Sequence, residues 1–83
     1  MIDVRTVSEF KNGFVQDAIN IEWQDISSIT DEYKKNQKIY LYCRSGNRSG
    51  KANDILINLG FKNVENLGSL ENASKYLKKK VIK

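Results

Sequence analysis

The stretch that most constrains the fold is 39–51, which reads Ile-Tyr-Leu-Tyr-Cys-Arg-Ser-Gly-Asn-Arg-Ser-Gly-Lys. Its first four residues are aliphatic or aromatic, and such a short apolar run is typical of a buried strand. The run ends at Cys43, six small, polar or basic residues follow, and the apolar residues of 52–59 recur at helical spacing. The sequence therefore predicts a strand, a tight loop and a helix, with a thiol at the carboxyl end of the strand.

The residues that follow Cys43 favour a reactive thiol. A lone cysteine at the end of a strand is usually a buried, inert small hydrophobe, but such a residue does not need two arginines and two glycines in the next seven positions. Ligands of parallel α/β sheets bind at the carboxyl ends of the strands, where loop N–H groups and a helix N-terminus attract anions. We therefore interpret Cys43 as an easily ionised thiol beside an anion site.

The candidate site residues lie in one loop and have different expected roles. Cys43 is the candidate nucleophile, and the backbone of the loop is the candidate anion cradle. We expect Arg48, at the start of the helix, to point inward as an anion ligand and Arg44 to lie at the mouth. Lys51 is a weaker candidate one turn further on. The expected substrate-binding residues are Arg44, Ser45, Gly46, Asn47, Arg48 and Ser49.

The composition excludes several kinds of chemistry. The chain contains no histidine, which excludes Cys–His proteases, Ser–His hydrolases and zinc sites with histidine ligands within these residues. One cysteine cannot form an internal disulfide, and we expect neither a metal nor a cofactor. Activation of Cys43 must therefore come from backbone dipoles and cations.

Length and charge indicate one small domain, 1–83. Its 83 residues allow a single modest core, and no run approaches the about 20 apolar residues that cross a bilayer. The net charge of +4 comes largely from lysines near the C-terminus, which we expect on a solvated helix rather than on a nucleic-acid surface. We expect a monomer that binds neither nucleic acid nor membrane. The compartment stays open between cytoplasm and periplasm, and a leader could precede Met1 in the native protein.

The rest of the chain alternates short strands with helices. We expect strands at 2–5, 18–22, 39–42 and 63–67, and helices at 6–12, 25–35, from the loop after Cys43 to about 59 with its apolar pattern beginning at 52, and from 70 onward. Thr6 and Glu9 have the form of a capping box, and Glu9 is expected to pair with Arg5. Trp23 is expected to fill the core. This alternation predicts an α/β fold, with a central parallel sheet of about four strands and helices on both faces.

At these residues the sequence resembles the rhodanese-like sulfurtransferases, of the small single-domain type. The segment 43–49, Cys-Arg-Ser-Gly-Asn-Arg-Ser, is similar to their active-site loop, and 2–5 with 9–10 resembles their opening Asp-Val-Arg…Glu-Phe motif. The segments 13–21 and 60–68 resemble further family motifs. Four residues depart from the family pattern and put the substrate preference in doubt: Phe14, Asp17, Ser69 and Ala73.

The resemblance implies both a topology and a reaction. The third strand would lie between the fourth and the first, with the second at one edge. Cys43 would take the outer sulfur of an anionic donor such as thiosulfate and pass it, as a persulfide, to cyanide, a thiol or a protein thiol. Two alternatives remain, a persulfide carrier without turnover of its own and a Cys-x5-Arg phosphatase. Four residues separate Cys43 from Arg48, and by resemblance the shorter loop fits sulfur rather than phosphate.

Overall fold

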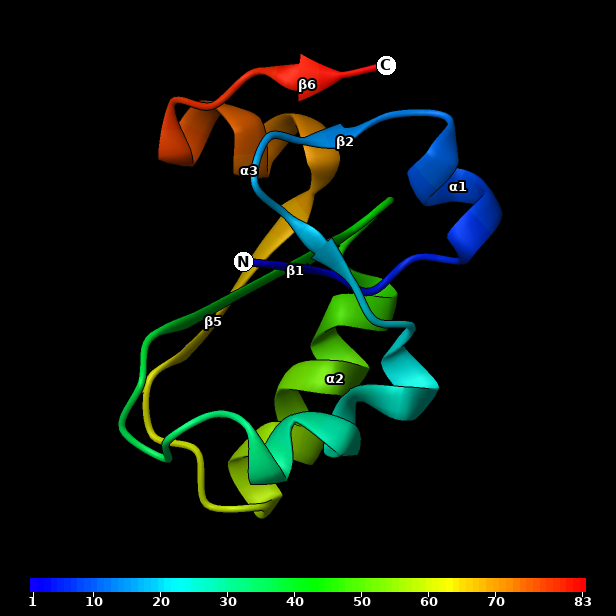
Figure 1. Cartoon of the computed structure of the whole chain (residues 1–83). Helices are drawn as coiled ribbons and strands as arrows, with labels where there is room; N and C mark the ends of the chain where they lie inside the picture. The colour runs from blue at the N-terminus through cyan, green and yellow to red at the C-terminus, as the bar shows by residue number, and fades with distance from the viewer.

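The computed structural model describes all 83 residues, Met1–Lys83, as a parallel sheet with helical segments on both of its faces and a small second sheet (Figure 1). In chain order the elements are β1 (Ile2–Asp3), α1 (Val7–Lys11), β2 (Phe14–Val15), β3 (Ile19–Asn20), η1 (Trp23–Asp31), β4 (Ile39–Cys43), α2 (Asn47–Asn58), β5 (Val64–Ser69), α3 (Leu70–Leu77) and β6 (Val81–Ile82).

The main sheet has the strand order β3-β1-β4-β5, and all of its pairs are parallel. This order confirms the expected topology, with the strand that ends at Cys43 between the first and the last. Successive side chains of β4 point to opposite faces, because a strand has a two-residue repeat. Leu41 and Cys43 pack with α2 and η1, whereas Tyr42 packs in a second apolar cluster with Leu67 and Ala73.

Each face of the sheet is therefore covered by its own layer. In Figure 1, α2 and η1 lie below the sheet, and α3 lies above it with β2 and β6. Ala52 and Leu56 of α2 and Ile26 and Ile29 of η1 are fully or almost fully buried in the lower core. This arrangement confirms the predicted α/β fold with helices on both faces.

The helix expected at 25–35 is wrong in both type and length. Residues Trp23–Asp31 form the 3-10 helix η1 instead. Ile26 and Ile29 are spaced by three, which places both on the buried side of a helix with three residues per turn. The serines, threonine and aspartates of this segment favour α-helix only weakly, and the Thr30 hydroxyl donates to the carbonyl of Ser27 at 2.7 Å.

The last helix ends before most of the C-terminal lysines, although the sequence pattern had indicated that they lie on it. Only Lys75 is in the helix, and Lys78, Lys79, Lys80 and Lys83 follow it. Helix α3 ends at Leu77, and Lys78 adopts a left-handed conformation with φ of 55°. The chain then turns back, and β6 pairs antiparallel with β2 in a two-stranded sheet that the sequence did not predict. Both strands are only two residues long, so their sequence carries almost no periodic signal.

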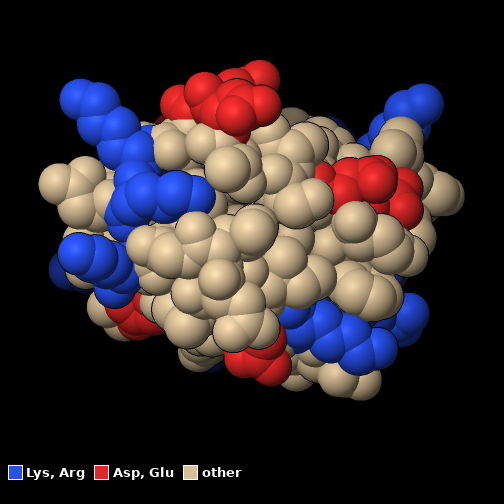
Figure 2. All heavy atoms as spheres, turned by 90° about the horizontal axis from the view of Figure 1, so that it is seen from below, with Lys and Arg blue, Asp and Glu red and all other residues tan.

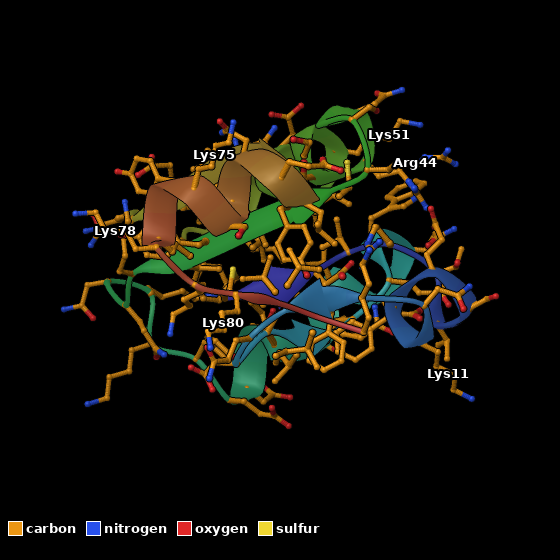
Figure 3. The ribbon with its side chains drawn as sticks, turned by 90° about the horizontal axis from the view of Figure 1, so that it is seen from above. Lys11, Arg44, Lys51, Lys75, Lys78 and Lys80 are labelled. Atoms are coloured by element: carbon orange, nitrogen blue, oxygen red, sulfur yellow. The ribbon has the colours of Figure 1, made fainter.

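Charged side chains of both signs are spread over the surface. On the face seen in Figure 2, Lys and Arg lie at separate edges, Asp and Glu lie between them, and the centre carries no charge. In Figure 3, Lys75, Lys78 and Lys80 lie at the opposite end of the molecule from Arg44 and Lys51. No helix of the chain has both the length and the apolar character that crossing a membrane requires.

Candidate active site

Cys43 is the last residue of β4 and is 0% exposed. The ladder between β4 and β5 shifts register between Leu41 and Cys43, so that Cys43 pairs with Ser69. After Cys43 the chain makes a short loop and enters α2, whose N-cap residue is Gly46. The strand, loop and helix predicted around Cys43 are therefore confirmed.

The loop folds back so that its donors point at the sulfur. The Gly46 N–H donates to Cys43 Sγ at 2.9 Å, and the Ser49 hydroxyl lies 3.5 Å from the same sulfur. Burial opposes ionisation of the thiol, but hydrogen bonds from the Ser49 side chain and from the N–H groups of Ser49, Ser45 and Gly46 outweigh it. As a result, the pKa of Cys43 is lowered. The direction agrees with the sequence expectation, although the main cause is hydrogen bonding rather than the arginines.

Gly46 is required by its conformation and by its neighbour. Its φ is 96°, in the left-handed region, and a Cβ at this position would lie 3.3 Å from Gly68 Cα. An L-residue side chain is strained at such a φ. The close approach of the loop to Gly68 of β5 therefore depends on a residue without a side chain.

Asn66 of β5 connects this loop to the sheet, and the sequence reasoning missed it. Its Oδ1 accepts from the Ser49 hydroxyl at 2.6 Å and from the Gly68 N–H at 2.9 Å. Its Nδ2 donates to the Gly46 carbonyl at 3.2 Å. One amide side chain thus bridges the start of α2, the loop and β5. Asn66 lies 17 positions after Ser49 in the sequence, so no local motif could have indicated the contact.

Arg48 is held by Glu9 rather than left free beside the sulfur. Its Nη1 and Nη2 donate to the two carboxylate oxygens of Glu9 at 2.7 and 3.0 Å. This bidentate contact lowers the pKa of Glu9 to about 2, and backbone and side-chain bonds from Thr6 add to the effect. Both side chains remain 27% exposed. The role of Arg48 as an anion ligand stays a prediction, because a bound anion would compete with Glu9.

The expected pair between Glu9 and Arg5 is wrong, because Arg5 pairs with Asp3. Arg5 Nε donates to both oxygens of Asp3 at 2.9 Å, and Nη2 donates to Asp3 and to the carbonyl of Gly13. Asp3 is 0% exposed and Arg5 is 7% exposed. A buried carboxylate needs the closest available cation, and two residues along an extended strand place Arg5 on the same face as Asp3.

The remaining candidate residues lie around the mouth of the loop. Arg44, Ser45 and Asn47 are exposed, and Arg44 takes part in none of the four ion pairs of the chain. Lys51 lies over the ring of Trp23, with Nζ 5.0 Å from the ring centroid. Arg44 is therefore the free cation of the loop, and Figure 3 shows it at the same end of the molecule as Lys51.

A cavity of about 430 Å³ opens beside the loop. Arg44 is the loop residue in its wall, and Cys43 itself does not line it. The other walls come from α1, from the start of α3 and from the C-terminal segment. Charged residues dominate the lining: Arg5, Glu9, Arg44, Glu71 and Lys83. No cluster of three or more Cys, Asp or Glu side chains in the chain could hold a metal ion.

Fold and site together define a class of α/β proteins in which a cysteine at the end of a central strand lies beneath an N–H-lined loop. Residues 1–75 match the family model described as "Rhodanese-like domain". The chain belongs to the rhodanese-like domain family, which confirms the resemblance seen in its sequence.

The relatives of this chain include one named as a sulfurtransferase and one named as a putative sulfur carrier. The chain is 38% identical over 72 residues to "Thiosulfate sulfurtransferase PspE" of Escherichia coli, covering 84% of this chain and 69% of that protein. It is 30% identical over 67 residues to "Putative sulfur carrier protein YrkF" of Bacillus subtilis, covering 81% of this chain and 36% of that protein. The solved structure "rhodanese with anions from E. coli" matches with a TM-score of 0.84 and 33% identity, over 99% of this chain and 94% of that one.

Proposed function

We propose that this protein is a sulfurtransferase that moves sulfane sulfur from thiosulfate, through a persulfide on Cys43, to a thiol or to cyanide. The observation that carries this proposal is the environment of Cys43 Sγ, which combines a lowered pKa with N–H donors on the loop side. A thiolate is the nucleophilic form of cysteine. The family and the relative named thiosulfate sulfurtransferase support the choice of donor.

The first half of the reaction loads the sulfur. The Cys43 thiolate attacks the outer sulfur of thiosulfate, a new S–S bond forms, and the S–S bond within thiosulfate breaks. Sulfite leaves with the electron pair of the broken bond, so that Cys43 carries a persulfide. N–H groups of the Arg44–Ser49 loop stabilise the negative charge as it moves from one sulfur to the next, in the manner of an oxyanion hole.

Access to the buried sulfur comes through the loop. Cys43 is 0% exposed, so a donor reaches Sγ only when side chains at the mouth move aside. Arg44, Ser45 and Asn47 are exposed, and their side chains make none of the chain's hydrogen bonds. Because no hydrogen bond holds these three side chains, they can move aside when an anion enters. The Arg44 guanidinium can then pair with the anion.

Intact-mass measurement tests the loading step. Brief treatment with thiosulfate should add one sulfur, about 32 Da, to the only thiol in the chain, and cyanide should remove it as thiocyanate. Cys43→Ser should show neither the adduct nor thiocyanate formation. A wild-type protein that gains no mass with thiosulfate or any other sulfane donor would refute the proposal.

The same preparation separates the two alternative functions. A persulfide carrier would load sulfur but would turn over only with a partner protein. The relative named as a putative sulfur carrier supports this alternative. Single loading without multiple turnover on small thiols would favour the carrier. A phosphatase would hydrolyse p-nitrophenyl phosphate, and we expect negligible hydrolysis because four rather than five residues separate Cys43 from Arg48.

A further inference from the structure

One cation in the wall of the cavity beside the loop, Arg5, has hydrogen-bonding capacity that no protein group fills. Arg5 is 7% exposed and lines the cavity. Its Nε and Nη2 bind Asp3 and the Gly13 carbonyl, whereas Nη1 makes none of the chain's hydrogen bonds. Among the fully buried side-chain nitrogen and oxygen atoms, only Asn53 Oδ1 lacks a hydrogen-bond partner. Nη1 also lacks a partner, so it is not fully buried and is accessible to solvent. Arg5 therefore lines the cavity with a side chain in which one guanidinium nitrogen has no protein partner.

The other charges around the cavity form a pattern of two signs. Arg44 and Lys83 are exposed cations in its lining, and neither has an ion-pair partner. Glu71, in the first turn of α3, is an exposed carboxylate that is also unpaired. Glu9 also lines the cavity, but its carboxylate is already paired with Arg48. The free groups thus offer several donors to an anion and one acceptor to a cation.

We propose that this cavity is an acceptor subsite for a small zwitterionic thiol, an amino-acid thiol or a short peptide that contains one. Its carboxylate binds Arg5 Nη1 with Arg44 or Lys83, and its ammonium binds Glu71. A volume of about 430 Å³ suits a ligand of this size. The proposal deepens the proposed function, because it names the acceptor that takes sulfur from Cys43.

The transfer that this subsite would serve is balanced. The acceptor thiolate attacks the outer sulfur of the Cys43 persulfide, an S–S bond forms to the acceptor, and the S–S bond to Cys43 breaks. Cys43 leaves as a thiolate with that electron pair, and the acceptor departs as a persulfide. Because Arg44 belongs to both the loop and the cavity wall, an acceptor anchored there lies next to the loop that covers Cys43.

Binding can be tested without any sulfur chemistry. S-methyl-L-cysteine carries the carboxylate and the ammonium but no free thiol. When added to isotopically labelled protein at millimolar concentration, it should shift the amide NMR signals of Asn12, Glu71 and Lys83 saturably. 2-(Methylthio)ethylamine, which lacks the carboxylate, should shift them much less. No saturable shift with S-methyl-L-cysteine, or equal shifts with both compounds, would overturn the subsite.

Kinetics of the loaded protein give the second test. The rate constants for removal of sulfur by L-cysteine and by cysteamine, compared per thiolate, should favour L-cysteine by roughly fivefold or more. Lys83→Glu should reduce this preference severalfold, and Glu71→Gln should slow both amines. Lys62→Glu and Glu32→Gln, exposed and outside the cavity, are the matched controls and should change neither rate.

The two tests separate this proposal from the one on which it rests. If Cys43 loads sulfur but L-cysteine and cysteamine react equally, and Lys83→Glu has no more effect than Lys62→Glu, the subsite is wrong and the sulfurtransferase proposal stands. If Cys43 never loads sulfur, the sulfurtransferase proposal fails, and the NMR titration alone decides whether the cavity binds a zwitterion.

Discussion

The loop around Cys43 and the wall of the neighbouring cavity are built in different ways. In the loop, the donors to the sulfur come from residues within six positions of Cys43 along the chain, and Asn66 and Glu9 contact the loop from other elements. The cavity wall joins α1, the start of α3 and the C-terminal segment, which meet only in the folded protein. The comparison indicates that the surroundings of the sulfur are encoded mainly by local sequence, whereas the cavity wall depends on tertiary contacts.

The largest effect should come from adding a side chain where the loop meets β5. Gly46→Ala places a Cβ at a φ of 96° and 3.3 Å from Gly68 Cα, which should destabilise the protein by roughly 1–3 kcal/mol. Because the N–H donor to Cys43 Sγ would move, sulfur transfer should fall by about a hundredfold. Denaturant unfolding and thiocyanate formation measure the two losses.

Gly50→Ala is the matched control for that change. Gly50 lies within α2, and its added Cβ would lie 3.6 Å from Asn66 Nδ2, an ordinary contact. Replacing a glycine inside a helix should stabilise the protein by about 0.5–1 kcal/mol and leave activity in place. Equal activity of the Gly46 and Gly50 variants would show that the geometry of the loop is not what activates the thiol.

A smaller loss should follow when the contact from β5 to the loop is removed. Asn66→Ala deletes the acceptor of the Ser49 hydroxyl and the donor to the Gly46 carbonyl. We expect about 1–2 kcal/mol less stability and roughly tenfold lower kcat/KM, because the loop is no longer tied to the sheet.

Asn63→Ala separates stability from positioning. Asn63 Nδ2 donates to the carbonyl of Asn36 at 2.6 Å, in the turn before β4, so its loss should cost a similar amount of stability without lowering kcat/KM. If both asparagine variants lose activity in proportion to stability, Asn66 has no particular role at the site.

Glu9→Gln tests the ion pair that joins the cavity wall to the loop. Because the folded pKa of Glu9 is about 2, below the ordinary 4.5, the charged carboxylate adds stability above pH 4.5, and this contribution is lost as the pH falls through about 2. Both side chains are partly exposed, so solvent screening limits the gain to about 1 kcal/mol. Glutamine can still accept from Thr6, which preserves the helix cap.

Denaturant unfolding at several pH values measures this contribution. The wild-type protein should be more stable than the variant at pH 7, and the difference should vanish near pH 2. Since Arg48 becomes available to anions, the KM for thiosulfate should fall in the variant. A higher KM would mean that Glu9 orients Arg48 rather than competing for it.

The smallest effect concerns the turn that leads into the cavity wall. Lys78 has a φ of 55° at the C-cap of α3, a conformation that glycine adopts without strain. Lys78→Gly should therefore stabilise the protein by about 0.5–1 kcal/mol. Lys80→Gly, at an exposed position without positive φ, should be neutral or slightly destabilising. Thermal unfolding distinguishes the two.

The sequence alone determined the central features of this protein. The stretch 39–51 indicated the strand, the loop and the helix, because apolar spacing and small residues determine backbone conformation over a few neighbouring positions. The alternation of elements predicted the parallel sheet, whose order then agreed with the family resemblance. Cys43 stood out as the candidate nucleophile because its neighbours suit an anion site and not a core. These inferences depend on local patterns, which a sequence displays directly.

Only the tertiary structure decided how charges and short segments are partnered. Several groups near Arg5 and Glu9 could have paired with them, and the choice of Asp3 for Arg5 and Arg48 for Glu9 follows from burial and distance. Asn66 and β6 meet their partners across many residues, and their own sequences carry no periodic signal. Contacts of that kind depend on the packing of the whole chain, since each is worth only about 1 kcal/mol and is selected by the geometry around it.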